Sequence, residues 1–260
     1  FHDDKTPSLQ VYEKTGTYNC FGCGAHGDVI QFIQDYEKLN KHQAIEKAKT
    51  LCNGHTINTK PIMTEPKENP AERKEIITKA WEYFTQASKS NSKQLKEYLE
   101  SRKLDPLKLE IGYNSGQFHH RKPAELVKQY AKYSLLLPGK SPSKTGLSFT
   151  AWASHCIIFP LRNKQNEVTS FYGRSIIDNN KSKHYYLKNR NGLYPHYPQP
   201  NTKKLLIPES IIDTATLQQI PEITGHYGLL ASYGTNGITE EHKQAIKELQ
   251  ELAEIILFFD

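Results

Sequence analysis

Two cysteines near the start of the chain have the spacing of a zinc site. Cys20 and Cys23 flank a two-residue gap in the segment CFGCG of residues 20–24. Thiolates at this spacing are frequent ligands of tetrahedral Zn²⁺. His2 and His26 would complete a closed site with two cysteines and two histidines, and the alternative is a ligand that precedes the first residue. The glycine-rich turn and short β-like stretches favour zinc over a redox pair, which belongs at a strand-to-helix junction.

Two acidic residues follow predicted strands in the last quarter of the chain. Glu209 ends an apolar stretch at 205–209, and Asp260 ends another at 255–260. The carboxyl ends of parallel strands share one edge of a sheet, and two carboxylates there can hold Mg²⁺ or Mn²⁺. Asp213, four residues after Glu209, would share a helix face with it if that turn is helical. The simpler interpretation of each acid is a helix cap or a salt-bridge partner.

Basic and aromatic residues are interleaved between residues 162 and 194. The basic members are Arg162, Lys164, Arg174, Lys181, Lys183, Lys188 and Arg190. The aromatic members are Phe171, Tyr172, Tyr185, Tyr186 and Tyr194. Cations bind phosphates and rings stack on bases, so this composition suits a single strand or a triphosphate. The alternative is an ordinary solvated face.

The composition excludes several classes of protein. The 260 residues include 34 Lys and Arg against 28 Asp and Glu, a formal charge of +6. No apolar run approaches the roughly 20 residues that cross a bilayer, and no signal peptide is recognisable, so we expect a cytoplasmic protein with no membrane partner. Four cysteines exclude a disulfide scaffold. Cys52 and Cys156, in apolar surroundings, are predicted to be buried structural residues.

The elements that must position these residues fall into three groups. Residues 1–52 predict a small zinc-ribbon β-domain, with strands at 8–12 and 17–19 and helices at 29–36 and 41–51, the first capped by Asp28. Residues 53–71 are rich in Thr, Asn, Lys, Pro and Glu and predict a linker. Residues 72–200 predict a mixed α+β subdomain: helices at 72–88, 92–102 and about 103–110, and strands at 111–113, 155–161 and 168–174.

The last group predicts an α/β unit with a parallel sheet over residues 201–260. Strands at 205–209 and 228–232 alternate with helices at 211–217 and 240–252, and a buried strand ends the chain. A buried strand that stops at its acidic residue has no element to lead into. We therefore expect a fragment truncated at both ends and inactive by itself.

Three motifs in sequence order resemble the DnaG-type bacterial primases. The first covers residues 1–49 and resembles the family's CHC2 zinc finger, with the matching segments FH at 1–2, KTPS at 5–8 and CFGCGAHGD at 20–28. The family's zinc ligands are Cys, His, Cys and Cys. His2, Cys20 and Cys23 match the last three, so the resemblance implies that the first Cys precedes Phe1 and that His26 is a neighbour of the site.

The second and third motifs resemble the family's catalytic core. Segments 98–113, 158–161 and 171–174 look like the RNA polymerase core, and residues 205–260 are similar to a Toprim domain. Glu209 and Asp213 stand where the family has Glu-Gly-x-x-Asp, with Ser210 in place of Gly. Asp260 matches the first acid of an Asp-x-Asp motif.

The resemblance implies roles for particular residues. The implied catalytic set is Glu209, Asp260, Asp213, Arg174 and Lys183, with Mg²⁺ (or Mn²⁺) held by Glu209 and Asp260. The implied zinc ligands are His2, Cys20 and Cys23, and the implied nucleic-acid contacts are Arg162, Arg174, Lys183 and Lys188. The family has a Lys-Tyr-Leu-Asn run where this chain reads KHYYLKN, so either Lys183 or Lys188 is the active-site lysine.

The function implied by the resemblance is that of a DNA primase. Such a nucleotidyltransferase makes short RNA primers from ribonucleoside triphosphates on single-stranded DNA, with a replicative helicase bound through a carboxy-terminal region outside this chain. One alternative is a non-catalytic zinc and Toprim protein that binds single-stranded DNA. Another is a Toprim nuclease or topoisomerase, against which the CHC2 finger argues. The divergent middle of the chain suggests a mobile element or plasmid as the source.

Overall fold

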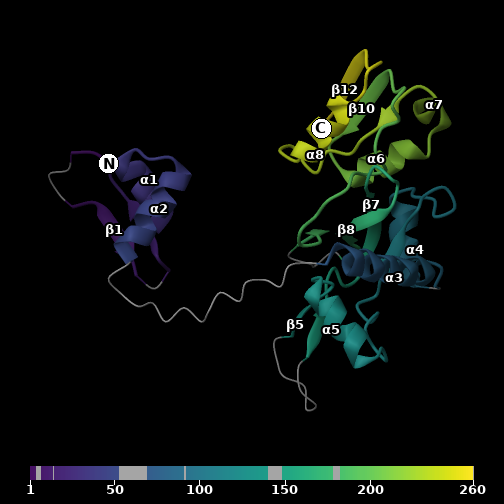
Figure 1. Cartoon of the computed structure of the whole chain (residues 1–260), viewed down its shortest axis with the longest axis horizontal. Helices are drawn as coiled ribbons and strands as arrows, with labels where there is room; N and C mark the ends of the chain where they lie inside the picture. Colours follow the sequence, from purple (N-terminus) through teal and green to yellow (C-terminus); the bar gives the residue numbers. More distant parts are fainter. Residues whose placement is uncertain are drawn as a thin grey trace. The chain divides into compact units, whose positions relative to one another are not determined.

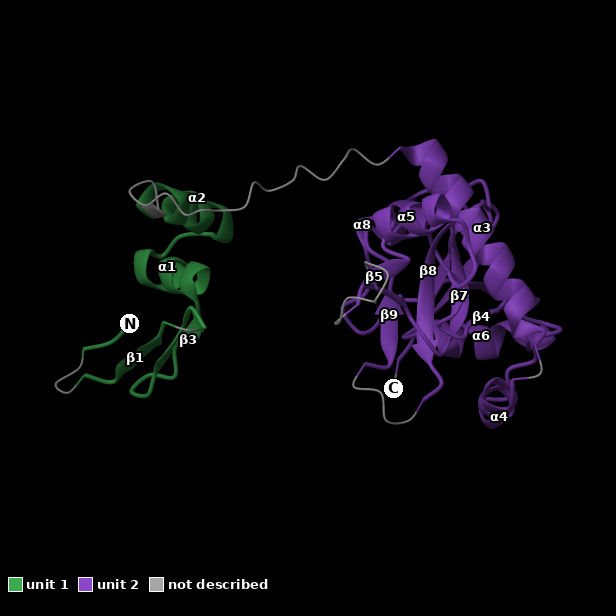
Figure 2. Ribbon diagram, turned by 90° about the horizontal axis from the view of Figure 1, so that it is seen from below, with its two compact units in different colours: residues 1–67 green, residues 68–260 purple. Residues whose placement is uncertain are grey.

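A computed structural model describes residues 1–3, 7–13, 15–52, 69–90, 92–139, 148–177 and 182–259. The chain forms two compact units, Phe1–Lys67 and Glu68–Asp260 (Figure 2). Most of the predicted linker, and Asp260, lie outside the described residues. Among the described residues, no helix combines the length and the apolar character that crossing a membrane would need.

The first unit is a three-stranded antiparallel ribbon followed by two helices. Its elements are β1 (Leu9–Tyr12), β2 (Thr17–Cys20), β3 (His26–Asp28), α1 (Val29–Glu37) and α2 (Lys41–Cys52). The side chain of Asp28 accepts a hydrogen bond from the amide of Gln31 at 2.9 Å, which confirms the predicted cap of α1. Strand β3 was not predicted, because its three residues are one glycine and two polar residues.

Aromatic rings supply much of the small core of this unit. Tyr18 is buried, and its ring stacks on Phe1 and meets the edge of Phe32 at centroid distances of 5.3 and 5.1 Å. Tyr36 stacks on Phe32 from the next turn of α1. Because strand β2 carries both Tyr18 and Cys20, this ring cluster fixes the strand that presents the first thiol.

The second unit begins with two helices (Figure 1) and a four-stranded antiparallel sheet in the order β4-β7-β8-β9 (Figure 2). Its first part comprises α3 (Pro70–Ser88), α4 (Lys93–Ser101), β4 (Gly112–Asn114), α5 (Ala124–Lys132), β5 (Leu136–Pro138), β6 (Phe149–Ala151), β7 (Cys156–Arg162), β8 (Val168–Ser175) and β9 (His184–Tyr186). Residues 103–110 form turns, so the short helix predicted there was wrong.

Both faces of this sheet are buried, which explains the almost continuous apolar run of β7. Alternate residues of a strand point to opposite faces. Ile158 therefore joins one core with Trp81 of α3, and Ile157 joins a second core with Leu95 of α4. The second core also contains Ile211, so the sheet packs directly against the carboxy-terminal part of the unit.

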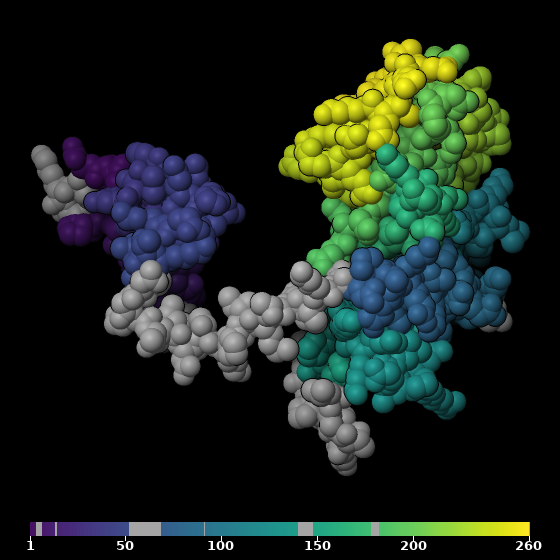
Figure 3. All heavy atoms as spheres, viewed as in Figure 1, coloured from purple at the N-terminus to yellow at the C-terminus, as the bar shows by residue number. Residues whose placement is uncertain are grey.

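A three-stranded parallel sheet follows, in the order β11-β10-β12. Its elements are β10 (Lys204–Pro208), α6 (Ile211–Gln218), α7 (Pro221–Thr224), β11 (Gly228–Leu229), α8 (Glu240–Lys247) and β12 (Glu254–Phe258). The parallel pairing was predicted, with β11 and α8 shorter than expected. The space-filling view places α8 and β12, in yellow, at the surface at one end of this unit (Figure 3).

The last strand departs from the prediction in its burial. The sequence predicted a buried strand, but Ile255, Leu257 and Phe258 are 46%, 63% and 51% exposed. The reason is its position, because β12 pairs with β10 on one side only and is an edge of the described sheet.

Candidate functional site

Three potential zinc ligands lie together in the first unit. The ligand atoms of His2, Cys20 and Cys23 are all within 4.8 Å of one another, and His2 Nδ1 lies 3.7 Å from Cys20 Sγ. His26 is outside this group and its Nδ1 contacts the carbonyl of Gly24 at 2.9 Å. The arrangement favours the ligand set implied by the family resemblance over the closed set that includes His26.

Local backbone geometry explains why the knuckle contains glycine. A Cβ on Gly22 would lie 2.5 Å from Nε2 of His2, so only glycine lets the turn approach the imidazole this closely. Gly24 has a φ of +76°, in the left-handed region. The hydroxyl of Ser8 and the amides of Cys23 and Gly22 lower the pKa of the Cys20 thiol to about 6. A thiolate beside an imidazole and a second sulfur is a donor set that fits Zn²⁺.

Glu209 lies at the carboxyl end of the parallel sheet. It directly follows β10, and its amide donates to the carbonyl of Phe258 at 3.0 Å, beside the end of β12. The hydroxyl of Thr235 donates to its carboxylate at 3.4 Å. Asp260 comes two residues after Phe258 but lies outside the described residues. Of the two predicted metal ligands, Glu209 and Asp260, the structure therefore describes only Glu209. A half-buried carboxylate here has the oxygen donors that Mg²⁺ prefers.

Asp213 has a different position from the one expected. Glu209 precedes α6 and is not in a helical turn with it. Ser210 is the N-cap of α6: its hydroxyl accepts from the amide of Asp213 at 3.2 Å and donates to the Asp213 carboxylate at 2.5 Å. The serine that replaces the family glycine therefore starts the helix, and Asp213 serves as the partner of the cap.

A row of basic and aromatic side chains crosses β8 and β9. Arg174 pairs with His184 in the sheet register, and its Nη1 donates to His184 Nε2 at 2.6 Å. Since arginine only donates, His184 Nδ1 carries the proton and donates to the hydroxyl of Tyr172 at 2.8 Å. Burial lowers the pKa of His184, and the charges of Arg174 and Lys183 lower it further.

A second arginine connects this row to the segment that contains Glu209. The guanidinium of Arg190 lies 4.1 Å from the ring centroid of Tyr186 and 4.7 Å from that of Tyr233. Tyr186 in turn lies 5.1 Å from Tyr172. Tyr233 immediately precedes Gly234, whose amide donates to the carbonyl of Glu209 at 2.9 Å. A continuous series of contacts therefore runs from Arg174 to Glu209.

The other predicted nucleic-acid contacts have unequal positions. Arg162 is 12% exposed in its side chain, with Nη2 at 2.5 Å from Glu110 and Nη1 donating to the carbonyl of Asn166, so it is a structural ion pair rather than a surface cation. Lys183 is exposed beside Arg174 and His184. Lys188 is exposed beyond β9, and its carbonyl accepts from Arg73 at 3.4 Å.

His184 and Tyr233 are the functional candidates that sequence reasoning missed. Nothing in the spacing of His184 distinguished it from its neighbours, because its partner Arg174 is defined by strand register. Tyr233 belonged to a recognised segment, but its ring contact with Arg190 depends on the packing of two different sheets.

Two family models match the chain. Residues 1–63 match the CHC2 zinc finger, and residues 83–194 match the amino-terminal domain of the DNA primase catalytic core. The first match contains His2, Cys20 and Cys23, and the second contains the row from Tyr172 to Arg190. The match to a CHC2 zinc finger indicates zinc binding by the first unit.

Curated relatives and solved structures agree with these models. The DNA primase of Haemophilus influenzae is 28% identical over 97% of this chain and 44% of its own length, and that of Campylobacter jejuni is 29% identical over 100% and 43%. The chain thus spans less than half the length of these relatives. The Aquifex aeolicus primase (zinc binding and RNA polymerase domains) matches all of this chain and 64% of its own at a TM-score of 0.59 and 20% identity. A DnaG primase catalytic domain bound to single-stranded DNA matches 72% of this chain and 62% of its own at 0.56 and 20%.

Proposed function

We propose that the chain is a member of the DnaG-type DNA primases and takes part in joining ribonucleoside triphosphates into RNA primers on single-stranded DNA, because its two parts match the family's zinc finger and catalytic-core models. The observation that carries this proposal is the contact series from Arg174 through Arg190 and Tyr233 to Glu209. It joins a carboxylate suited to a divalent cation with cations suited to phosphate. Nucleotidyl transfer needs both kinds of group at one site.

The acidic edge would hold the catalytic metal. Glu209 and Asp260 are the proposed ligands of Mg²⁺ or Mn²⁺, and residues 201–260 are proposed to form part of a Toprim domain. A divalent cation lowers the pKa of an attacking hydroxyl and offsets the charge that develops at phosphorus. Thr235 orients the Glu209 carboxylate, and Asp213 acts indirectly through the Ser210 cap that begins the next helix.

The basic row would bind the phosphates of the triphosphate or the template. Arg174 is proposed to contact phosphate oxygens while His184 fixes the orientation of its guanidinium. Lys183, exposed beside this pair, is favoured over Lys188 as the active-site lysine because it lies near Arg174. His2, Cys20 and Cys23 would hold a structural Zn²⁺ in the unit proposed to engage the template.

Replacing Glu209 tests the proposal. Template-directed dinucleotide synthesis is measured with the complete gene product, because the curated relatives extend beyond this chain. We expect Glu209→Gln to lower the rate by about two orders of magnitude, since a lost metal ligand removes several kcal/mol of transition-state stabilisation. Glu222→Gln, which changes an exposed acid of α7, is the matched control and should retain full activity.

Two outcomes would contradict the proposal. Undiminished synthesis by Glu209→Gln would remove this residue from the mechanism. No synthesis by the unmodified protein, with binding of single-stranded DNA retained, would favour a non-catalytic binding protein instead.

A further inference from the structure

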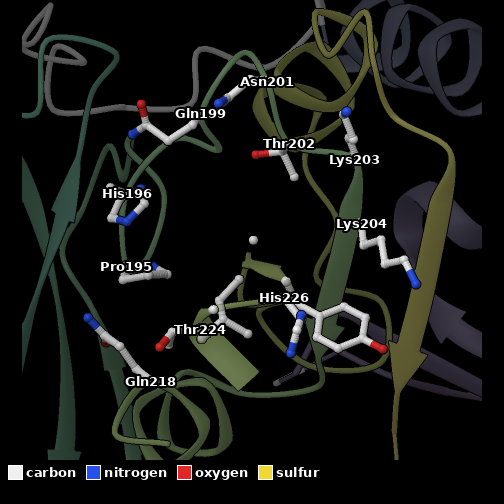
Figure 4. A pocket seen from close by; sticks show the side chains of 14 residues that line it. Pro195, His196, Gln199, Asn201, Thr202, Lys203, Lys204, Gln218, Thr224 and His226 are labelled. Atoms are coloured by element: carbon white, nitrogen blue, oxygen red, sulfur yellow. The ribbon is translucent and has the colours of Figure 1, made fainter. Parts of the chain in front are cut away.

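A separate cleft lies at the amino-terminal ends of the strands of the parallel sheet, whereas Glu209 lies at their carboxyl-terminal ends. It has a volume of about 470 Å³ and is formed where β10 and β11 begin, between the turn 199–203 and the segment 224–227 (Figure 4). Glu209 follows the other end of β10, and a five-residue strand spans about 16 Å. The cleft therefore does not belong to the acidic site or to the basic row.

The lining of this cleft contains basic and amide side chains but no acidic ones. Lys203, Lys204, His196 and His226 contribute nitrogen groups, and no aspartate or glutamate of the described residues lines it. Gln199, Asn201 and Gln218 add three primary amides. Figure 4 shows these residues around the hollow, with the ammonium group of Lys204 directed away from its centre toward β12. A lining with cations and amide donors but no carboxylate is suited to an anion.

Contacts within the lining show which polar atoms remain for a ligand. The oxygen of the Gln218 amide accepts from the hydroxyl of Tyr194 at 3.1 Å, which leaves its NH₂ group as a donor. Nδ1 of His196 donates to the carbonyl of Tyr197 at 2.7 Å, which leaves Nε2. The amide of Thr202 donates to the carbonyl of Gln199 at 2.9 Å and fixes the turn that carries two of the amides.

The two lysines already form ion pairs with glutamates outside the cleft, but these pairs are too weak to prevent the lysines from binding an anion. Lys203 Nζ lies 3.7 Å from Glu251, and Lys204 Nζ lies 3.2 Å from Glu254, with 51–73% of the lysine side chains exposed. Exposed pairs of this kind contribute little to stability and are screened by salt. Because both lysine side chains are long and exposed, they can turn toward a multivalent anion in the cleft.

We propose that this cleft binds a small phosphate-bearing molecule of the size of a mononucleotide, at a site separate from the proposed catalytic centre. The volume is within the roughly 300–1,000 Å³ of small-molecule sites. The lysines and the turn amides would contact the phosphates, while Gln218 and His196 offer hydrogen bonds to a base or sugar. The proposal does not depend on primase activity.

Binding of ATP to the complete protein tests this site. The affinity is measured by isothermal titration calorimetry with a metal chelator present and salt at about 0.15 M, to screen unspecific attraction to the exposed charges. The variant Gln199→Glu/Asn201→Asp places two carboxylates in the turn without changing side-chain size, and both positions are exposed. We expect it to weaken ATP binding at least tenfold. The matched control Gln165→Glu/Gln250→Glu makes the same charge change at exposed positions outside the cleft and should stay within twofold of the unmodified protein.

The remaining arms distinguish this site from its alternatives. Glu209→Gln should leave metal-free ATP binding unchanged, whatever it does to primer synthesis. No binding of ATP, equal losses in the two double variants, or retained affinity in Gln199→Glu/Asn201→Asp would each overturn the proposal. Full displacement of ATP by an oligodeoxynucleotide without terminal phosphate would also overturn it, by assigning the cleft to nucleic acid.

Discussion

Cys20 and Cys156 carry the same thiol in opposite environments. Cys156 is fully buried in β7, and burial raises its pKa to about 12, whereas hydrogen bonds lower the pKa of Cys20 to about 6. The thiolate is the form that reacts with alkylating agents and binds metals. Cys156 is therefore inert in the folded protein, whereas Cys20 is available to a metal.

We predict a cysteine-specific pattern of alkylation. With iodoacetamide at pH 7.5, Cys20 and Cys23 should be modified in chelator-treated protein and protected after Zn²⁺ is restored, because a coordinated sulfur is a poor nucleophile. Cys156 should stay unmodified in both samples until denaturant is added. Peptide mass spectrometry gives the modified fraction at each site. Equal labelling of Cys20 with and without Zn²⁺ would argue against its role as a ligand.

At the residue scale, the sequence identified metal-ligating side chains more reliably than the ion-pair partners of charged side chains. The group His2, Cys20 and Cys23 was anticipated from residue type and spacing together with the family resemblance, and the structure brings these three together. Arg162 was placed with the nucleic-acid contacts, yet its charge faces Glu110, 52 residues earlier in the chain. No local pattern reveals such a partner, because it depends on how β4 and β7 pair.

Helix α8 depends on a buried histidine at its first turn. Nδ1 of His242 accepts from the amide of Thr239 at 3.2 Å, and its Nε2 donates to the carbonyl of Ala231 at 2.9 Å. The neutral ring thus links the start of α8 to the segment after β11. Burial lowers the pKa of His242, so the folded state favours this neutral form.

Because of this histidine, we predict that the folded protein loses stability in acid. A lowered pKa in the folded state contributes stability above the ordinary histidine value of about 6.5, and that contribution is lost as the pH falls through the folded-state pKa. His242→Gln keeps a capping side chain but does not titrate. We expect it to cost about 1 kcal/mol at pH 7.5, for the lost bond to Ala231, and less at pH 5.5.

Urea unfolding followed by circular dichroism measures this difference. His226→Gln, at an exposed position of the same unit, is the control and should preserve the pH dependence of the unmodified protein. A gap between His242→Gln and the unmodified protein that is constant from pH 7.5 to 5.5 would show that protonation of His242 is not involved.

Periodicity predicted most of the long elements and missed most of the short ones, although the nine-residue helix α5 was also missed. Helices α3 and α4 and strands β7, β8 and β10 were predicted to within a few residues, because each has a clear apolar period or run. Strands β3, β5, β6 and β9 have three residues each, too few for any period, and are set by pairing with neighbours. The row that includes His184 and Tyr186 lies on one of these short strands, so its geometry could not be predicted.

At the scale of the whole molecule, the two units differ in how much core supports them. The described part of Phe1–Lys67 buries only Tyr18, Cys20, Ile33 and Ala44, whereas the larger unit contains three hydrophobic clusters. Domains below roughly 70 residues rarely supply enough stability from a core alone and often use a metal. Metal binding then contributes directly to folding.

We therefore predict that removing zinc unfolds one unit and leaves the other intact. Treatment with a strong chelator should collapse the NMR dispersion of residues 1–52 while the signals of residues 69–259 keep their positions. Restoring Zn²⁺, but not Mg²⁺, should recover the first set, because sulfur and imidazole ligands do not suit a hard cation. Persistence of the folded signals of residues 1–52 in protein verified to be metal-free would contradict this prediction.

Strand β12 has a consequence for the behaviour of the chain in solution. Its exposed side chains include Ile255 and Leu257, and no strand among the described residues pairs with its far side, so backbone donors and acceptors there can pair with another strand. Two copies that meet along this border can extend one another's sheet without unfolding. Concentrated solutions of the folded chain should therefore scatter light because of ordered association. The substitution Leu257→Lys should reduce this association.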